Sequence, residues 1–110
     1  VVVRTIGLKV VTGQGALNRV VTGGYACDLL SCVMARARSG NLWVTLQAHT
    51  NVVAVASLLE LAAVIITEGV QPDPAACEKA EAEGVALLSS PETTFAVVAR
   101  LAGLGIAAGS

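Results

Sequence analysis

The feature that most constrains the fold is a regular alternation of short apolar runs with longer segments of helical character. The first two apolar runs follow one another directly. From the second run onward, each run is followed by a short connection and then a helical segment. This order predicts a three-layer α/β/α domain with a largely parallel central sheet, forming a single unit over the whole chain. The expected strands lie at residues 8–12, 19–22, 42–46, 63–67 and 85–89.

Residue types at the segment ends predict where the helices begin and end. The best marked helix has Asp73 as its N-cap, Pro74 as its first residue and Gly84 as its stop. An earlier helix is expected to hold Asp28 in its first turn and to stop at Gly40.

Two further helices are expected from weaker signals. Thr50 or Asn51 is the expected cap of a helix that runs to about residue 60. That segment is apolar on nearly all sides and rich in Val, so only burial between other elements would stabilise it as a helix. The last helix is expected to open at residues 90–91, with Phe95, Val98 and Leu101 at helical spacing.

Composition limits the classes of function. Hydrophobic residues make up 55% of the 110 residues and charged residues only 14%, against about 25% charged in typical domains. Such a surface favours association with a partner or a second copy, although Ala and Val packed inside one core are an alternative. With a net charge of −1, one Trp, one Tyr and one Phe, the chain lacks the basic patch and stacking surface that nucleic-acid binding needs.

The remaining composition argues against membrane and metal functions. No apolar run reaches the roughly 18 residues that a membrane helix requires, and the longest is broken by Glu60. Cys27, Cys32 and Cys77 form no C-x-x-C pair, and His49 is the only histidine, so we expect reduced thiols in a cytoplasmic protein, with no metal and no cofactor. Residues 1–7 are too short for a signal peptide, and we expect an N-terminal segment to be trimmed or absent.

Polar residues follow two of the expected strands. In open α/β sheets, ligands bind at the carboxyl ends of the strands, beside helix N-termini. If the strands are neighbours, these loops and a third at residues 68–73 should converge on one edge. The candidate ligand-binding residues are Thr22, Gly23, Gly24, Tyr25, Asp28, Gln47, His49, Thr50 and Asn51.

The first loop offers backbone groups to an anion. Gly23 and Gly24 would let amides approach a phosphate or carboxylate, with Tyr25 covering it. A plain strand-to-helix turn is the alternative for the two glycines. Asp28 would meet a cation or a sugar hydroxyl, or would serve only as an acid in the first turn of a helix.

The second loop offers side chains. Gln47, Thr50 and Asn51 would donate or accept hydrogen bonds from a ligand, or would only satisfy the first amides of the next helix. His49 would act as a lone acid–base group or pH-sensitive contact, or lie exposed. Neither a P-loop nor a Ser-His-Asp grouping occurs, so we expect no enzyme; a small enzyme using His49 and Asp28 is the least favoured hypothesis.

Two long stretches carry a family resemblance. They are VTGGYACDLLSCVMARARSGNLWVTLQAHTNVVAVASLLELAAVIITEG and PDPAACEKAEAEGVALLSSPETTFAVVARLAGLGI. With these the chain resembles the small stand-alone proteins of the DRTGG-domain family, over about residues 6–106. The family's fold is similar to the N-terminal domains of HPr kinase/phosphorylase and of a Mur-type ligase. This implies the same layered α/β architecture.

The resemblance also implies a role. Family members are attached to CBS-domain pyrophosphatases and phosphotransacetylases, where they look like regulatory or dimerising modules. The leading hypothesis is therefore a non-catalytic regulatory module, homodimeric, that binds a small anionic ligand, with an adenine nucleotide as one candidate. A protein-interaction adaptor without a ligand is the alternative.

The family's namesake motif is altered here. Its Asp-Arg pair belongs in the loop where this chain has QAHTN, at residues 47–51. Its Thr-Gly-Gly falls near Thr67, Glu68 and Gly69, so a Glu replaces one glycine.

Overall fold

A computed structural model describes residues 9–12 and 21–108 of the chain. Five strands form one sheet in the order β1-β5-β4-β3-β2. β2 to β5 run parallel, and β1 joins β5 antiparallel at one edge. The strands are β1 (Lys9–Thr12), β2 (Gly23–Ala26), β3 (Asn41–Thr45), β4 (Ala63–Ile66) and β5 (Leu87–Ser89).

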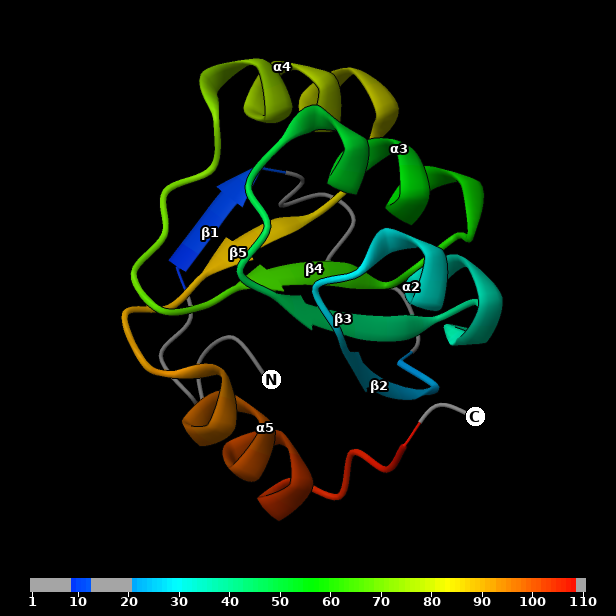
Figure 1. Ribbon diagram of the computed structural model, residues 1–110, viewed down its shortest axis with the longest axis vertical. Helices are drawn as coiled ribbons and strands as arrows, with labels where there is room; N and C mark the ends of the chain where they lie inside the picture. Colours follow the sequence, from blue (N-terminus) through cyan, green and yellow to red (C-terminus); the bar gives the residue numbers. More distant parts are fainter. Residues whose placement is uncertain (1–8, 13–20, 109–110) are drawn as a thin grey trace.

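Helices cover both faces of this sheet. α2, α3 and α4 lie on one face and α5 lies on the other (Figure 1). The predicted three-layer α/β/α architecture with a largely parallel sheet is therefore confirmed. The helices are α2 (Leu30–Arg36), α3 (Thr50–Leu58), α4 (Pro74–Glu83) and α5 (Thr94–Gly103).

The core consists of two clusters, one on each side of the sheet. Val64 and Ile66 of β4 face the cluster under α2, α3 and α4, while Ile65 between them faces the cluster under α5. This alternation follows from the two-residue period of a strand, and it explains why β4 is apolar at every position. All four residues of β4 are buried.

Burial also explains the helicity of α3. Its buried residues are Val52, Val53, Val55 and Ala56, and they pack in the first cluster. The helix begins at Thr50, with His49 as its N-cap, so the prediction that Thr50 or Asn51 caps it was wrong by one or two residues.

α4 has the ends predicted for it. Asp73 is the N-cap and Pro74 the first residue. Gly84 ends the helix in the left-handed conformation at φ 69°, and its N–H donates to the Ala80 carbonyl. A left-handed residue at this position closes the last turn, which is why glycine is favoured there.

The prediction for β2 was wrong. Gly23 and Gly24 lie inside the strand and pair with Asn41 and Leu42 of β3, whereas a glycine turn was expected to end a strand at residues 19–22. Residues 19 and 20 lie outside the described part. The tertiary structure overrides the usual strand-breaking tendency of glycine, because the C-terminal tail approaches β2 closely at Gly24.

Two helix boundaries also differ from the predictions. α2 begins at Leu30, so Asp28 precedes the helix, and it ends at Arg36 rather than at Gly40. α5 begins at Thr94 rather than at residues 90–91, because the Thr93 side chain accepts a hydrogen bond from the Ala96 N–H and caps the helix.

The C-terminal tail returns to the sheet after α5. The Ile106 N–H donates to the Leu101 carbonyl at 3.1 Å and the Gly105 N–H to the Ala102 carbonyl at 3.0 Å. With Gly105 at φ 88°, these bonds form a Schellman motif that turns the chain back. The Gly24 N–H then donates to the Ala107 carbonyl at 2.9 Å. The tail thus lies along the outer side of the edge strand β2.

Candidate functional site

Polar groups from two loops meet at the carboxyl edge of β2 and β3. The Thr45 hydroxyl and the Leu46 N–H both donate to Oδ1 of Asp28, at 2.8 and 2.9 Å. The Gln47 side-chain amide donates to the Asp28 carbonyl at 3.0 Å. Asp28 and Gln47, both predicted site residues, are therefore brought together, and they hold the loop before α2 against the end of β3.

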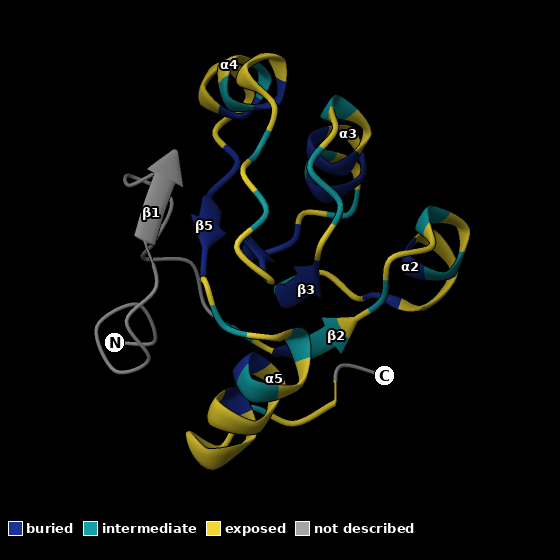
Figure 2. Cartoon of the chain, turned by 60° about the vertical axis from the view of Figure 1, so that its left-hand side comes forward, coloured by how far each residue is buried: buried dark blue, intermediate teal, exposed yellow. Residues whose placement is uncertain are grey.

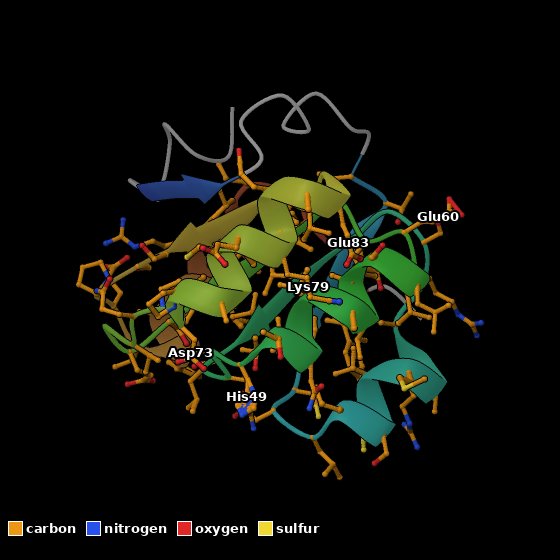
Figure 3. All side chains as sticks on the ribbon, turned by 90° about the horizontal axis from the view of Figure 1, so that it is seen from above. His49, Glu60, Asp73, Lys79 and Glu83 are labelled. Atoms are coloured by element: carbon orange, nitrogen blue, oxygen red, sulfur yellow. The ribbon has the colours of Figure 1, made fainter. Side chains whose placement is uncertain are left out.

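The loop after β3 joins the loop after β4 at the same edge. The Asp73 N–H donates to the Ala48 carbonyl at 2.9 Å, and His49 and Asp73 lie near one another in Figure 3. His49 and Asn51 are exposed and Thr50 is half-buried. These three predicted residues thus lie at the start of α3, and Asn51 lies on its α2 side, in the wall of a pocket with Leu30 and Met34.

Three helix N-termini lie at this edge without side-chain caps. The capping positions of α2, α3 and α4 are Leu29, His49 and Asp73, and none of these side chains accepts a hydrogen bond from its helix. The first amides of a helix point outward and carry the positive end of the helix dipole. The edge therefore offers N–H donors of the kind that bind anions at helix N-termini.

The start of α5, on the other face of the sheet, is capped twice. Besides the Thr93 cap, Oε2 of Glu68 accepts a hydrogen bond from the Thr94 N–H at 2.8 Å. The hydroxyls of Thr67 and Thr94 lie 2.6 Å apart. The amides of α5 are therefore engaged by the protein itself.

The backbone at the expected Thr-Gly-Gly position has the conformation of two glycines. Glu68 has φ 61° and Gly69 has φ 71°. Both angles lie in the left-handed region, which residues other than glycine rarely adopt. Glu68 holds this conformation while its carboxylate caps α5. A glycine would adopt this conformation at position 68 without the strain that Glu68 bears.

The other predicted residues lie at the opposite edge of the sheet. Thr22 donates its hydroxyl proton to the Ser39 carbonyl at 2.9 Å and accepts from the Asn41 side-chain amide at 3.2 Å. Because β2 runs parallel to β3, Gly23 at its start lies at the amino edge. The expected convergence is therefore wrong for Thr22, Gly23 and Gly24.

Tyr25 lies within β2 and packs against the core cluster under α2, α3 and α4. Its side chain is therefore used in packing, and the expectation that it covers a ligand held by Gly23 and Gly24 does not fit this placement.

Basic side chains at the carboxyl edge of β2 and β3 are few. Of the basic residues in the described part of the chain, Arg36 and Arg38 lie at the amino edge, at the end of α2 and just before β3. Lys79 is paired with Glu83 at 3.0 Å, and Arg100 is paired with Glu92 at 2.6 Å. Lys9 lies in β1 opposite Ser89, on the far side of the sheet from β2 and β3. Lys79 lowers the pKa of Glu83 through a hydrogen bond, helped by Ser57, but this pair lies on α4 away from the edge (Figure 3). An anion at the edge would thus meet amide N–H groups and His49.

Sequence reasoning missed the buried hydroxyls behind the edge. Thr45 and Thr67 are fully buried, and each follows an apolar run at the end of a strand. The Thr67 hydroxyl donates to the Thr45 carbonyl at 3.4 Å. A threonine at or just after the end of each of two neighbouring apolar strands was the available signal. Only the strand pairing, with the Thr67 N–H donating to the Thr45 carbonyl at 2.9 Å, shows that the two lie side by side.

Other classes of site find no support in the described residues. Within residues 9–12 and 21–108, no group of three or more His, Cys, Asp or Glu side chains is placed to hold a metal ion. None of the helices in this part of the chain combines the length and apolarity that a membrane crossing requires. Cys27, Cys32 and Cys77 are free thiols, each half-buried.

The sheet, its helix layers and this polar edge define a three-layer α/β domain. Residues 1–104 match the DRTGG domain family, and the chain therefore belongs to that family. No curated protein sequence matches it.

A solved structure shares the fold. It is the crystal structure of the CBS and DRTGG domains of the regulatory region of Clostridium perfringens pyrophosphatase, in complex with the activator diadenosine tetraphosphate. The similarity has a TM-score of 0.67 at 11% sequence identity, and it covers 89% of this chain and 43% of that one. This chain thus spans less than half the length of that protein, and at this identity the likeness shows the fold alone.

Proposed function

We propose that this chain is a non-catalytic, cytoplasmic regulatory module that senses a small anionic ligand and acts as a homodimer. The observation that carries the ligand proposal is the meeting of three uncapped helix N-termini at the carboxyl edge. The proposed contacts are the first amides of α2 and α3, with Gln47, His49, Thr50 and Asn51 around them.

The proposed ligand class is an adenine nucleotide. The structural neighbour is a regulatory region crystallised with a dinucleoside polyphosphate, and phosphate suits the amide donors of helix N-termini. Asp28 and Asp73 are carboxylates at the same edge and oppose an anion, so we expect weak binding. Asp28 keeps its bonds to Thr45 and Leu46 in this proposal and acts as a support for the loop.

A non-catalytic role is favoured over catalysis by His49 and Asp28. Oδ1 of Asp28 is already engaged by two donors, and a general base must reach the proton that it abstracts. Family membership also favours regulation, because the similar solved structure is a regulatory region.

The test is the melting temperature in the presence of AMP, ATP, diadenosine tetraphosphate or inorganic phosphate. A ligand at about a hundred times its dissociation constant adds roughly 2.7 kcal/mol to the free energy of unfolding, a shift of several degrees for a domain of this size. His49→Ala and Asn51→Ala should reduce the shift, each measured against its own ligand-free protein. Thr22→Ala, at the opposite edge, is the matched control and should retain it.

The ligand-free adaptor is the second candidate, because large apolar side chains are exposed. Leu29, Met34 and Leu58 lie uncovered on α2 and α3 or beside them. This candidate would be favoured if none of the ligands shifted the melting temperature and the chain were monomeric.

A further inference from the structure

The face of the sheet that α5 covers is not closed completely. A pocket of about 230 Å³ opens there between β2, β3, α5 and the C-terminal tail. It exists because β2 presents only small residues on this face and because one helix cannot cover a five-stranded sheet. Its walls include Gly24, Ala26, Val44, Leu101, Ala102 and Ile106.

One large side chain stands exposed on the same helix. Phe95, the only Phe of the chain, is 85% exposed near the start of α5. Phe95, Ala99 and Ala102 are spaced i, i+4 and i+7, so they share one face of the helix, and all three are exposed. In Figure 2 the outer side of α5 is coloured as exposed.

We propose that α5 is the homodimer interface, with Phe95 of each copy inserted into the pocket of the other. This inference rests on the homodimer part of the proposed function and is independent of the ligand part. An interface between two identical copies related by a two-fold axis must match itself, so that each contact occurs twice. Phe95 and part of the pocket wall both belong to α5, so two copies of this helix can make the same contact twice.

The spacing along α5 fits such a contact. Phe95 and Ala102 are seven residues apart, about 10 Å along the helix axis. If a second α5 lies antiparallel across a two-fold axis near residues 98–99, Phe95 of each copy lies opposite Ala102 of the other. Ala102 is in the wall of the pocket, so the same arrangement fills both pockets.

Size and polarity fit as well. A dry apolar cavity of about 150 Å³ already accommodates benzene, so 230 Å³ accommodates a Phe ring. Burial of an exposed Phe is a strong driving force for association. Arg100 and Glu92 are paired with each other, and the Glu68 carboxylate at the start of α5 accepts a hydrogen bond from the Thr94 N–H. Each of these charges beside α5 therefore already has a partner within its own copy.

The interface is small, and this sets the conditions of the test. A ten-residue helix is about 15 Å long, and only the pocket rim adds to its area. This lies at the low end of the interface sizes found in specific complexes. We therefore expect a dimer that dissociates in the micromolar range.

Sedimentation equilibrium across micromolar to millimolar concentrations tests this inference without any ligand. The wild-type chain should dimerise, while Phe95→Asp and Ala102→Phe, which fills the pocket from within, should each weaken dimerisation at least 100-fold. Leu58→Asp is the control, at a Leu on α3 that is 68% exposed against 85% for Phe95, and it should dimerise like the wild type. Circular dichroism checks that each variant is folded.

Three outcomes would overturn the inference. A monomeric wild-type chain at millimolar concentration would remove the dimer itself. A dimer that survives both Phe95→Asp and Ala102→Phe would place the interface elsewhere, and a dimer lost on Leu58→Asp would move it to α3. None of these outcomes tests ligand binding. The proposed ligand contacts lie at the starts of α2 and α3, on the face of the sheet opposite α5.

Discussion

The hydroxyl of Thr45 lies 2.8 Å from Oδ1 of Asp28 and donates to it from a fully buried strand end. This bond fixes the loop before α2 to β3. Thr45→Val keeps the shape of the side chain but removes the donor, and we expect a loss of about 1–2 kcal/mol in the free energy of unfolding. Asp28→Ala should lose a similar amount.

A double-mutant cycle in urea separates this bond from other effects of the two substitutions. If the bond is the cause, Thr45→Val on the Asp28→Ala background should lose clearly less than it does alone. Additive losses would contradict the assignment.

The side chain of Ile106 limits the size of the residue that fits at position 24. A Cβ on Gly24 would lie 3.4 Å from Cγ2 of Ile106, so the larger Gly24→Val should strain the contact with the tail by about 1–3 kcal/mol. On an Ile106→Ala background most of this loss should disappear, because Val is favoured in strands once space exists. Thermal unfolding of the four proteins measures this.

The same substitution separates two interpretations of the paired glycines. Gly24→Val should leave the ligand-induced shift in melting temperature intact, because Gly24 lies at the amino edge. Loss of the shift in a folded Gly24→Val protein would restore the first loop to the site.

Glu68 combines backbone strain with a helix cap. Glu68→Ala keeps φ near 61° but removes the bond to the Thr94 N–H, and Glu68→Gly removes the bond and also relieves the strain. Because the left-handed conformation costs other residues about 1 kcal/mol, the Gly variant should be the more stable of the two by about that amount. Denaturant unfolding measures the difference in stability between the two variants. A Glu68→Ala protein as stable as Glu68→Gly, or more stable, would contradict this account.

The pKa of Glu83 should lie below its ordinary value in the folded chain, because Lys79 and then Ser57 donate hydrogen bonds to its carboxylate. The stabilisation is present at pH values above the pKa of the unfolded chain and is lost as the pH falls through the folded value. A ¹³C NMR titration of the Glu carboxyl carbons measures the shift. Lys79→Ala should raise the pKa of Glu83 back toward normal, and an unchanged value would contradict the pairing.

Elements whose signals are local could be predicted from the sequence. Asp73, Pro74 and Gly84 mark both ends of α4 by residue type alone, and the run at residues 63–66 shows a strand buried on two faces. Asp28 and Gln47 were expected near one another because parallel strands end at one edge, and their side-chain and backbone groups do meet.

Features that depend on distant residues could not be predicted. Gly23 and Gly24 resemble a turn until one knows that the tail near Ile106, more than eighty residues later, lies against them. In α5, Phe95 and Val98 have the periodicity of a buried stripe, yet Val97 and Leu101 are the residues that face the sheet. Periodicity shows that a helix forms, whereas the docking of the helix decides which side is buried.

The ligand proposal is tested most directly by mapping backbone amide chemical shifts during titration with ATP and with diadenosine tetraphosphate. We predict the largest changes at the first amides of α2 and α3, among them Leu30, Thr50 and Asn51, with little change at Gly24. Largest changes at Gly24 or along α5, or no change at millimolar ligand, would contradict sensing of an adenine nucleotide at the carboxyl edge.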